Sequence, residues 1–118
     1  MKTFKESHDF FKRAKESDRM HKKYPTRICV IVEKARNAPK DTPDIDRKKY
    51  LVPRDISISQ FMYVIRNRIH MPTEKSLFLF VDYSNMPPTG AMIGSIYEEY
   101  KDADGFLYIT YASESTFG

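Results

Sequence analysis

The 118 residues are 41% hydrophobic and 14% aromatic, which suits one globular domain and excludes an intrinsically disordered chain. The single cysteine, Cys29, excludes an internal disulfide and favours a reducing compartment. No apolar run exceeds five residues and the first residues are polar, so we expect neither a membrane span nor a secretory signal peptide.

Residues 1–24 carry the whole net charge of +4, because they hold eight basic and four acidic residues while the rest of the chain is balanced. We predict one helix here, capped by Ser7 and ended by Pro25. The surplus charge favours binding to an acidic protein or an anionic membrane surface, and is only a weak indication of nucleic-acid binding. One face is expected to present Phe10, Ala14, Ser17, His21 and Tyr24. Opposite charges are expected to pair as Asp9–Arg13, Lys12–Glu16 and Asp18–Lys22.

The first clear strand is predicted at residues 27–33. Ile28, Val30 and Val32 form an apolar face. On the other face, Cys29 and Ile31 are apolar between polar ends, so they need a cover, and the N-terminal helix is the nearest candidate. A seam left partly open between that helix and the sheet would form a pocket.

A loop over residues 35–46 leads into a second strand, Tyr50–Val52, which three basic residues precede and Pro53 closes. Proline cannot donate to a β-ladder, so this strand is expected at a sheet edge. Such an edge could dock an extended, acidic-flanked, partly aromatic peptide. The alternative is an ordinary edge strand that its lysines and arginines protect from unwanted pairing.

The remaining pattern alternates helices and strands. We predict a helix from the cap Ser57 to about His70, a strand at 77–81, a helix at 91–100 capped by Thr89, a turn at 102–105, a strand at 106–111 and a free tail at 112–118. This order predicts an α+β, β-grasp fold with a mixed four-stranded sheet wrapped around the longer helix. Residues 1–25 form a helical extension, and residues 26–111 form the core.

No catalytic or metal-binding constellation is apparent. His8, His21, His70 and Cys29 lack metal-ligand spacing, and four glycines form no phosphate-binding loop. We therefore expect no catalytic residues, no metal and no cofactor.

Several segments, taken in order along the chain, resemble the autophagy ubiquitin-like modifiers, the family of GABARAP and microtubule-associated protein light chain three. The matching segments are Lys23–Ile28, Val32–Ala35, Asp44–Pro53, Gln60–Arg66, Pro87–Thr89, Tyr100–Tyr108 and Thr116–Gly118. The resemblance implies a ubiquitin-like fold with two additional N-terminal helices. It also implies that the Gly118 carboxylate is activated, passed on as a thioester and linked to phosphatidylethanolamine, which makes the protein a substrate and not an enzyme.

The resemblance further implies two receptor pockets beside the edge strand. An aromatic side chain of the receptor would enter a pocket formed by Glu16, Met20, Cys29, Ile31, Lys49, Leu51 and Phe106. An aliphatic side chain would enter a pocket formed by Tyr50, Val52, Pro53, Ile56, Phe61, Val64, Ile65 and Arg68. The acidic flank of the motif would meet Arg27, Arg47, Lys48 and Lys49. For the apolar members, core packing is the alternative role, and it is also the alternative for Leu77–Phe80, the family's proposed second docking surface.

The implied partners are receptor peptides, a processing protease, activating and conjugating enzymes and, after conjugation, the membrane. A monomer in the cytoplasm is expected, and then at the autophagosome membrane and in the vacuole or lysosome. Three features depart from the family: Cys29 replaces a usual proline, the 37–43 loop is about two residues longer, and no residue follows Gly118 for a protease to remove. The alternatives are a non-conjugated adaptor that uses the same grooves and a cytoskeletal or nucleic-acid binder that uses residues 1–24.

Overall fold

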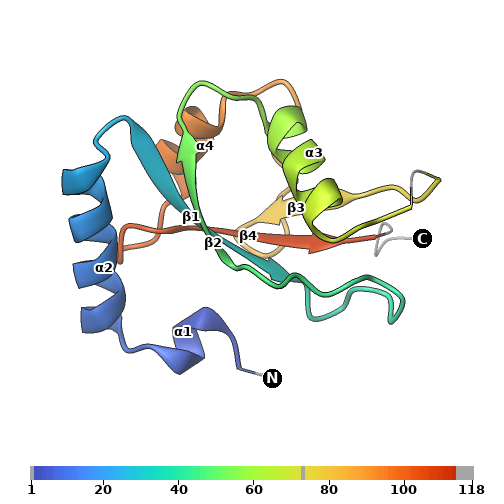
Figure 1. The fold of residues 1–118 in the computed structure, drawn as a ribbon, viewed down its shortest axis with the longest axis horizontal. Coiled ribbons are helices and arrows are strands. Elements are labelled where there is room, and N and C mark those ends of the chain that lie inside the picture. Colours follow the sequence, from blue (N-terminus) through green and yellow to red (C-terminus); the bar gives the residue numbers. More distant parts are fainter. Residues whose placement is uncertain (1, 73, 114–118) are drawn as a thin grey trace.

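The computed structural model describes residues 2–72 and 74–113, and Figure 1 shows their arrangement. The elements in chain order are α1 (Phe4–Ser7), α2 (Phe10–Lys23), β1 (Arg27–Lys34), β2 (Lys49–Pro53), α3 (Ile58–Arg68), β3 (Phe78–Val81), α4 (Ile93–Tyr100) and β4 (Leu107–Ala112). Each predicted strand lies within two residues of its expected bounds, and Ser57 caps α3 as predicted, by accepting a hydrogen bond from the Gln60 N–H.

The four strands form one mixed sheet in the order β2-β1-β4-β3. β1 pairs antiparallel with β2 and parallel with β4, and β4 pairs antiparallel with β3. The β-grasp prediction is therefore confirmed, and β2 lies at one edge of the sheet, as the proline at its end indicated.

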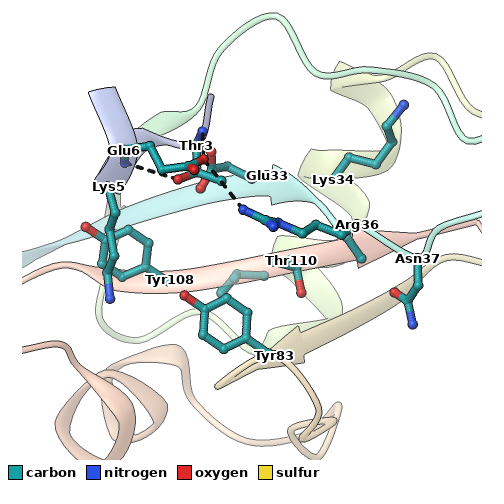
Figure 2. Close-up of a pocket in the computed structure, with 12 residues that line it drawn as sticks. Thr3, Lys5, Glu6, Glu33, Lys34, Arg36, Asn37, Tyr83, Tyr108 and Thr110 are labelled. Carbon is teal, nitrogen blue, oxygen red and sulfur yellow. Dashed lines mark hydrogen bonds and ion pairs between the residues drawn. The ribbon is translucent and has the colours of Figure 1, made fainter. Parts of the chain in front are cut away.

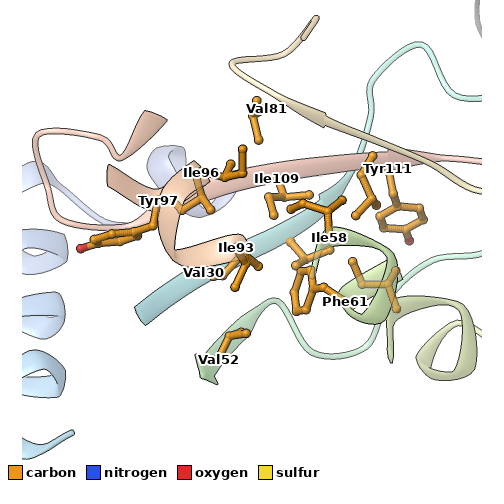
Figure 3. Close-up of a cluster of buried hydrophobic side chains, with 14 of the residues drawn as sticks. Val30, Val52, Ile58, Phe61, Val81, Ile93, Ile96, Tyr97, Ile109 and Tyr111 are labelled. Carbon is orange, nitrogen blue, oxygen red and sulfur yellow. The ribbon is translucent and has the colours of Figure 1, made fainter. Parts of the chain in front are cut away.

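The sheet buries a different cluster on each face. On one face, α3 and α4 cover the main core, to which Val30, Ile109 and Phe61 contribute (Figure 3). On the other face, Cys29 and Ile31 pack with Phe106 and with Phe4 of α1, and Met20 of α2 lies against them. The expected cover is thus confirmed, although the first helix of the chain supplies its most buried part.

The N-terminal segment contains two helices, as the family resemblance implied, so the single helix predicted from the residue pattern, with Ser7 as its cap, is wrong. Thr3 caps α1 in a reciprocal capping box with Glu6. The chain is extended at His8, and Asp9 then caps α2 by accepting from the Lys12 N–H. Asp and Thr accept from free helix N–H groups as well as Ser does, so the segment offered several caps and tertiary packing selected two of them.

The inner face of α2 is polar. Ser17 is buried, whereas Phe10 and Tyr24 are 51% and 38% exposed, so the predicted apolar face is wrong at both ends. Arg13 Nε donates to Asp104 Oδ2 at 2.8 Å, and Ser17 Oγ donates to the Asp104 carbonyl in a very short hydrogen bond. α2 therefore docks on the 102–105 turn through hydrogen bonds, in addition to the apolar contact that Met20 makes.

Three other predictions need correction or completion. Met92 is the N-cap residue of α4 and makes no side-chain cap hydrogen bond, so Thr89 is not the cap. Residues 112 and 113, predicted to begin a free tail, belong to the folded body, because Ala112 ends β4 and Ser113 is fully buried. Leu77, Leu79 and Phe80 are buried, which supports their role as core residues. Within residues 2–72 and 74–113, no helix is long and apolar enough to cross the hydrocarbon layer of a membrane.

Candidate functional site

The outer edge of β2 carries backbone groups that no described strand of the sheet engages. The Val32 N–H donates to the Lys48 carbonyl at 2.7 Å, and the β1–β2 register pairs Ile31 with Lys49. Hydrogen bonding alternates along an antiparallel ladder, so Tyr50 and Val52 bond to β1 while Lys49 and Leu51 direct their N–H and C=O groups outward. A guest strand could pair there, up to Pro53, which has no N–H.

A strand added at this edge would present side chains to both faces of the sheet. Successive side chains alternate between faces, so two residues separated by an odd number lie on opposite faces. An aromatic-x-x-aliphatic motif therefore sends its aromatic side chain to one face and its aliphatic side chain to the other. Each of the two predicted pockets corresponds to one face.

The first face has a hollow of about 640 Å³ where α1 and α2 approach β2. Its lining residues are Phe4, Met20, Asp46, Arg47, Lys48, Lys49, Tyr50 and Leu51. Of the predicted aromatic pocket, the lining includes Met20, Lys49 and Leu51. Sequence reasoning missed Phe4 and Asp46. The signal for Phe4 was available, since Thr3 and Glu6 flank it in the spacing of a capping box, which marks a helix start.

Three predicted pocket residues lie beneath this hollow and do not line it. Cys29, Ile31 and Phe106 are at most 1% exposed, and Phe4 packs edge-on against Phe106 with ring centroids 5.4 Å apart. Burial, with a smaller contribution from the charge of Glu16, raises the pKa of the Cys29 thiol to about 11. This position is therefore a small apolar packing residue.

The basic residues predicted to contact the receptor differ in whether an internal carboxylate already pairs with them. Lys49 Nζ donates to both carboxylate oxygens of Glu16, at 2.8 and 2.7 Å, and this contact links α2 to β2. Lys48 Nζ donates to Glu33 at 2.9 Å. Arg27 and Arg47 are exposed, and within the described part of the chain they form no ion pair. An acidic peptide flank would meet these two arginines without displacing an internal partner.

The predicted aliphatic pocket divides into core and surface residues. Val52, Phe61 and Ile65 are at most 4% exposed and belong to the main core. The Tyr50 ring packs edge-on against Phe61, and Tyr50 and Ile56 are partly buried. At the surface, Pro53 is half-buried, Val64 is 43% exposed and Arg68 Nε bonds Asp46 at 3.0 Å. Only these partly buried and exposed members are accessible to a guest side chain in this arrangement.

A second hollow, of about 510 Å³, lies on the other side of α1 and was not predicted (Figure 2). The cap Thr3 and the α1 residues Lys5 and Glu6 face Tyr108 and Thr110 of β4 across it, with the end of β1 and Tyr83 completing the wall. α1 therefore separates two hollows, with Phe4 lining one and its neighbours lining the other.

Gly118, the predicted conjugation residue, lies outside the described residues. Ser113 is the last described residue before it and is fully buried. Within residues 2–72 and 74–113, no group of three or more His, Cys, Asp or Glu side chains is placed to hold a metal ion.

Comparisons with known proteins agree with this geometry. A family model described as autophagy protein Atg8, ubiquitin like, matches residues 12–118. Autophagy-related protein 8e of Arabidopsis thaliana is 56% identical over 115 residues, covering 98% of this chain and 92% of the relative. Autophagy-related protein 8 of Saccharomyces cerevisiae is 52% identical over 116 residues, covering 98% and 97%. The crystal structure of Trypanosoma brucei ATG8 superposes with a TM-score of 0.89 at 37% identity, covering 100% of this chain and 99% of that one.

Proposed function

The chain belongs to the Atg8 family of ubiquitin-like autophagy proteins, and from this premise we propose that it is a modifier conjugated through Gly118 to phosphatidylethanolamine. In that state it recruits cargo receptors and autophagy factors that carry aromatic-x-x-aliphatic motifs. It acts as the substrate of the conjugating enzymes. The protein moves between the cytoplasm, the autophagosome membrane and the vacuole or lysosome.

The observation that carries receptor binding is the pair of outward-facing backbone positions, Lys49 and Leu51, at the edge of the sheet. A receptor peptide adds a strand there, and its backbone hydrogen bonds supply affinity for any extended sequence. Specificity comes from the side chains. The hollow beside Met20 and Leu51 takes the aromatic residue, and the surface around Tyr50 and Pro53 takes the aliphatic residue.

Charge adds selectivity for acidic flanks. Arg27 and Arg47 are exposed, so they attract a distant acidic segment and raise the association rate. Lys48 and Lys49 are held by Glu33 and Glu16, so a receptor acid must compete with an internal carboxylate at each of them. We therefore expect the arginines to dominate the salt dependence of receptor binding.

The proposed conjugation would use the carboxylate of Gly118. The Gly118 carboxylate attacks the α-phosphate of ATP and releases pyrophosphate, and an enzyme thiol then displaces AMP to form a thioester. The amine of phosphatidylethanolamine displaces the thiol and leaves an amide. Glycine has no Cβ, so the chain end fits a narrow enzyme channel, and the two acyl chains of the lipid give stable anchoring where one chain is marginal.

One conjugation assay tests this proposal. The wild-type protein, Gly118→Ala and the control Ser115→Ala would each be incubated with activating and conjugating enzymes of an Atg8 system, ATP and vesicles containing phosphatidylethanolamine. We expect lipid attachment for wild type and Ser115→Ala and none for Gly118→Ala, with unchanged receptor-peptide affinity in all three. Lipid attachment of Gly118→Ala, or none for wild type, would refute conjugation through this residue. The second outcome, with intact peptide binding, would favour a non-conjugated adaptor.

A second candidate function rests on the outer face of α2. Lys12, Lys15 and Arg19, together with Glu16, line a shallow hollow there of about 260 Å³, one turn from the exposed Phe11. Binding of a polyanion such as nucleic acid or a cytoskeletal filament through this face would weaken steeply with salt. Deletion of residues 1–24 would abolish it.

A further inference from the structure

The loop between β1 and β2 closes over the end of β4. Thr42 Oγ1 and Ser113 Oγ share a hydrogen bond of 2.7 Å, and the Ser113 N–H donates to Thr42 Oγ1 at 3.3 Å. The two residues are separated by 71 positions in the chain and are 3% and 0% exposed. Ser113 is the point at which the described body passes into residues 114–118.

The loop is itself held at several points, so Thr42 is a fixed partner. Lys34 Nζ on β1 donates to the Thr42 carbonyl at 3.3 Å and pairs with Asp44 at 2.6 Å. The Tyr111 hydroxyl on β4 donates to the Pro43 carbonyl at 2.6 Å. Lys75, just before β3, pairs with Asp41. Three separate parts of the body therefore hold the loop against the end of β4.

We call the hydrogen-bonded pair of Thr42 and Ser113 the hydroxyl latch. We propose that this latch makes Thr42 a positioning residue for conjugation at Gly118, by fixing where and in which direction the chain leaves the body. The inference rests on the proposed function, because it gives the latch a role in that reaction. Gly118 follows Ser113 by five positions, and a stretch of five residues spans at most about 18 Å. With so short a span, the position of Ser113 decides which enzyme sites the carboxylate can reach.

Loss of the latch would lower the fraction of molecules in which Ser113 is placed correctly for conjugation. An enzyme that grips the folded body and reacts at the chain end uses the fraction of molecules whose Ser113 is correctly placed. If that fraction falls, the apparent KM rises in proportion and kcat does not change. Removal of the Thr42 hydroxyl leaves the buried Ser113 N–H and hydroxyl without their partner, so the latched arrangement loses population.

The test compares four variants with the wild-type protein. Thr42→Val removes the hydroxyl at nearly constant volume, Thr42→Ser restores a hydroxyl, Ser113→Ala removes the other partner, and Thr89→Val is a matched control at an exposed threonine far along the chain from both. KM and kcat for lipid attachment would be measured with the enzymes and vesicles named above. Hydrogen exchange of the Ser113 amide, measured by NMR without any enzyme, reports the latch directly.

We expect Thr42→Val and Ser113→Ala each to raise KM at least about two-fold at unchanged kcat, and their combination to do no more than either alone. Thr42→Val should also speed Ser113 amide exchange about ten-fold, while Thr42→Ser and Thr89→Val stay near wild type. An unchanged exchange rate in Thr42→Val would refute the latch, even if the wild-type protein proves not to be conjugated. Unchanged KM with faster exchange, or an equal KM rise in Thr89→Val, would refute the positioning role.

Discussion

Replacing Leu51 by proline should weaken receptor-peptide binding strongly while leaving the fold intact. The Leu51 N–H faces outward, so proline removes no bond between β1 and β2. Its ring instead occupies the space of the outward N–H, where a guest carbonyl would lie. Tyr50→Pro, one residue earlier, is the matched control, because the Tyr50 N–H faces β1 and its loss orphans a carbonyl in the ladder.

The magnitudes follow from the groups at the edge. Lys49 and Leu51 offer two N–H and two C=O groups, each worth about 1 kcal/mol net when bonded. Proline removes one hydrogen bond to the guest strand outright and holds the guest strand away from β2 at the neighbouring bonds. We therefore expect a loss of about 2–3 kcal/mol of binding free energy, or roughly 30- to 150-fold in Kd. The half-buried Leu51 side chain accounts for about 1 kcal/mol of stability in the same variant. Tyr50→Pro should lose about 3 kcal/mol or more and unfold in part.

Isothermal titration calorimetry with a synthetic acidic-flanked aromatic-x-x-aliphatic peptide would measure Kd, and urea unfolding would measure stability. Leu51→Ala separates the contribution of the side chain from that of the backbone. Affinity of Leu51→Pro within two-fold of Leu51→Ala would show that the guest does not use the backbone of β2. Equal stability of Tyr50→Pro and Leu51→Pro would show that the assigned alternation of hydrogen bonds is wrong.

Three further predictions concern groups beside the site. Asp104→Asn leaves Arg13 nearly buried against a neutral amide, so urea unfolding should show a loss of about 2–4 kcal/mol, and a loss below about 1 kcal/mol would contradict a docking role for this pair. Burial opposes ionisation of Asp102, but the hydrogen bonds from Lys5 and from the Asp104 N–H, together with the positive charges of Lys5 and Arg13, outweigh it and lower the pKa of that carboxyl. The stabilisation is therefore present above about pH 4 and is lost as the pH falls through the lowered folded pKa, so the stability difference between wild type and Asp102→Asn should disappear in acid. Cys29, with a pKa of about 11, should react with a thiol reagent at pH 8 about 100-fold more slowly in the folded protein than in urea, and equal rates would show that the thiol is accessible.

Local pattern was sufficient wherever neighbouring residues decide the structure. The short apolar run Ile28–Val32 placed β1, the Ser57 cap placed the start of α3, and Pro53 placed β2 at an edge, because each of these signals acts over a few residues. The resemblance in sequence then placed Lys49 and Leu51 in the aromatic pocket beside this edge strand. The hydrogen-bond alternation independently turns the same two residues outward.

Contacts between distant segments were decided by the tertiary structure alone. The sequence predicted that Arg13 would pair with Asp9 and Glu16 with Lys12, four residues away, yet they bond to Asp104 and Lys49, which lie 91 and 33 residues away. Asp18–Lys22 pairs as predicted, because that part of α2 is exposed and nothing else competes. The positions of Phe4 in the receptor hollow and of Thr42 against Ser113 were likewise decided by tertiary packing. A buried charge or ring gains more from a fixed, desolvated partner than from a solvated neighbour on its own helix, and only the assembled fold determines which partner that is.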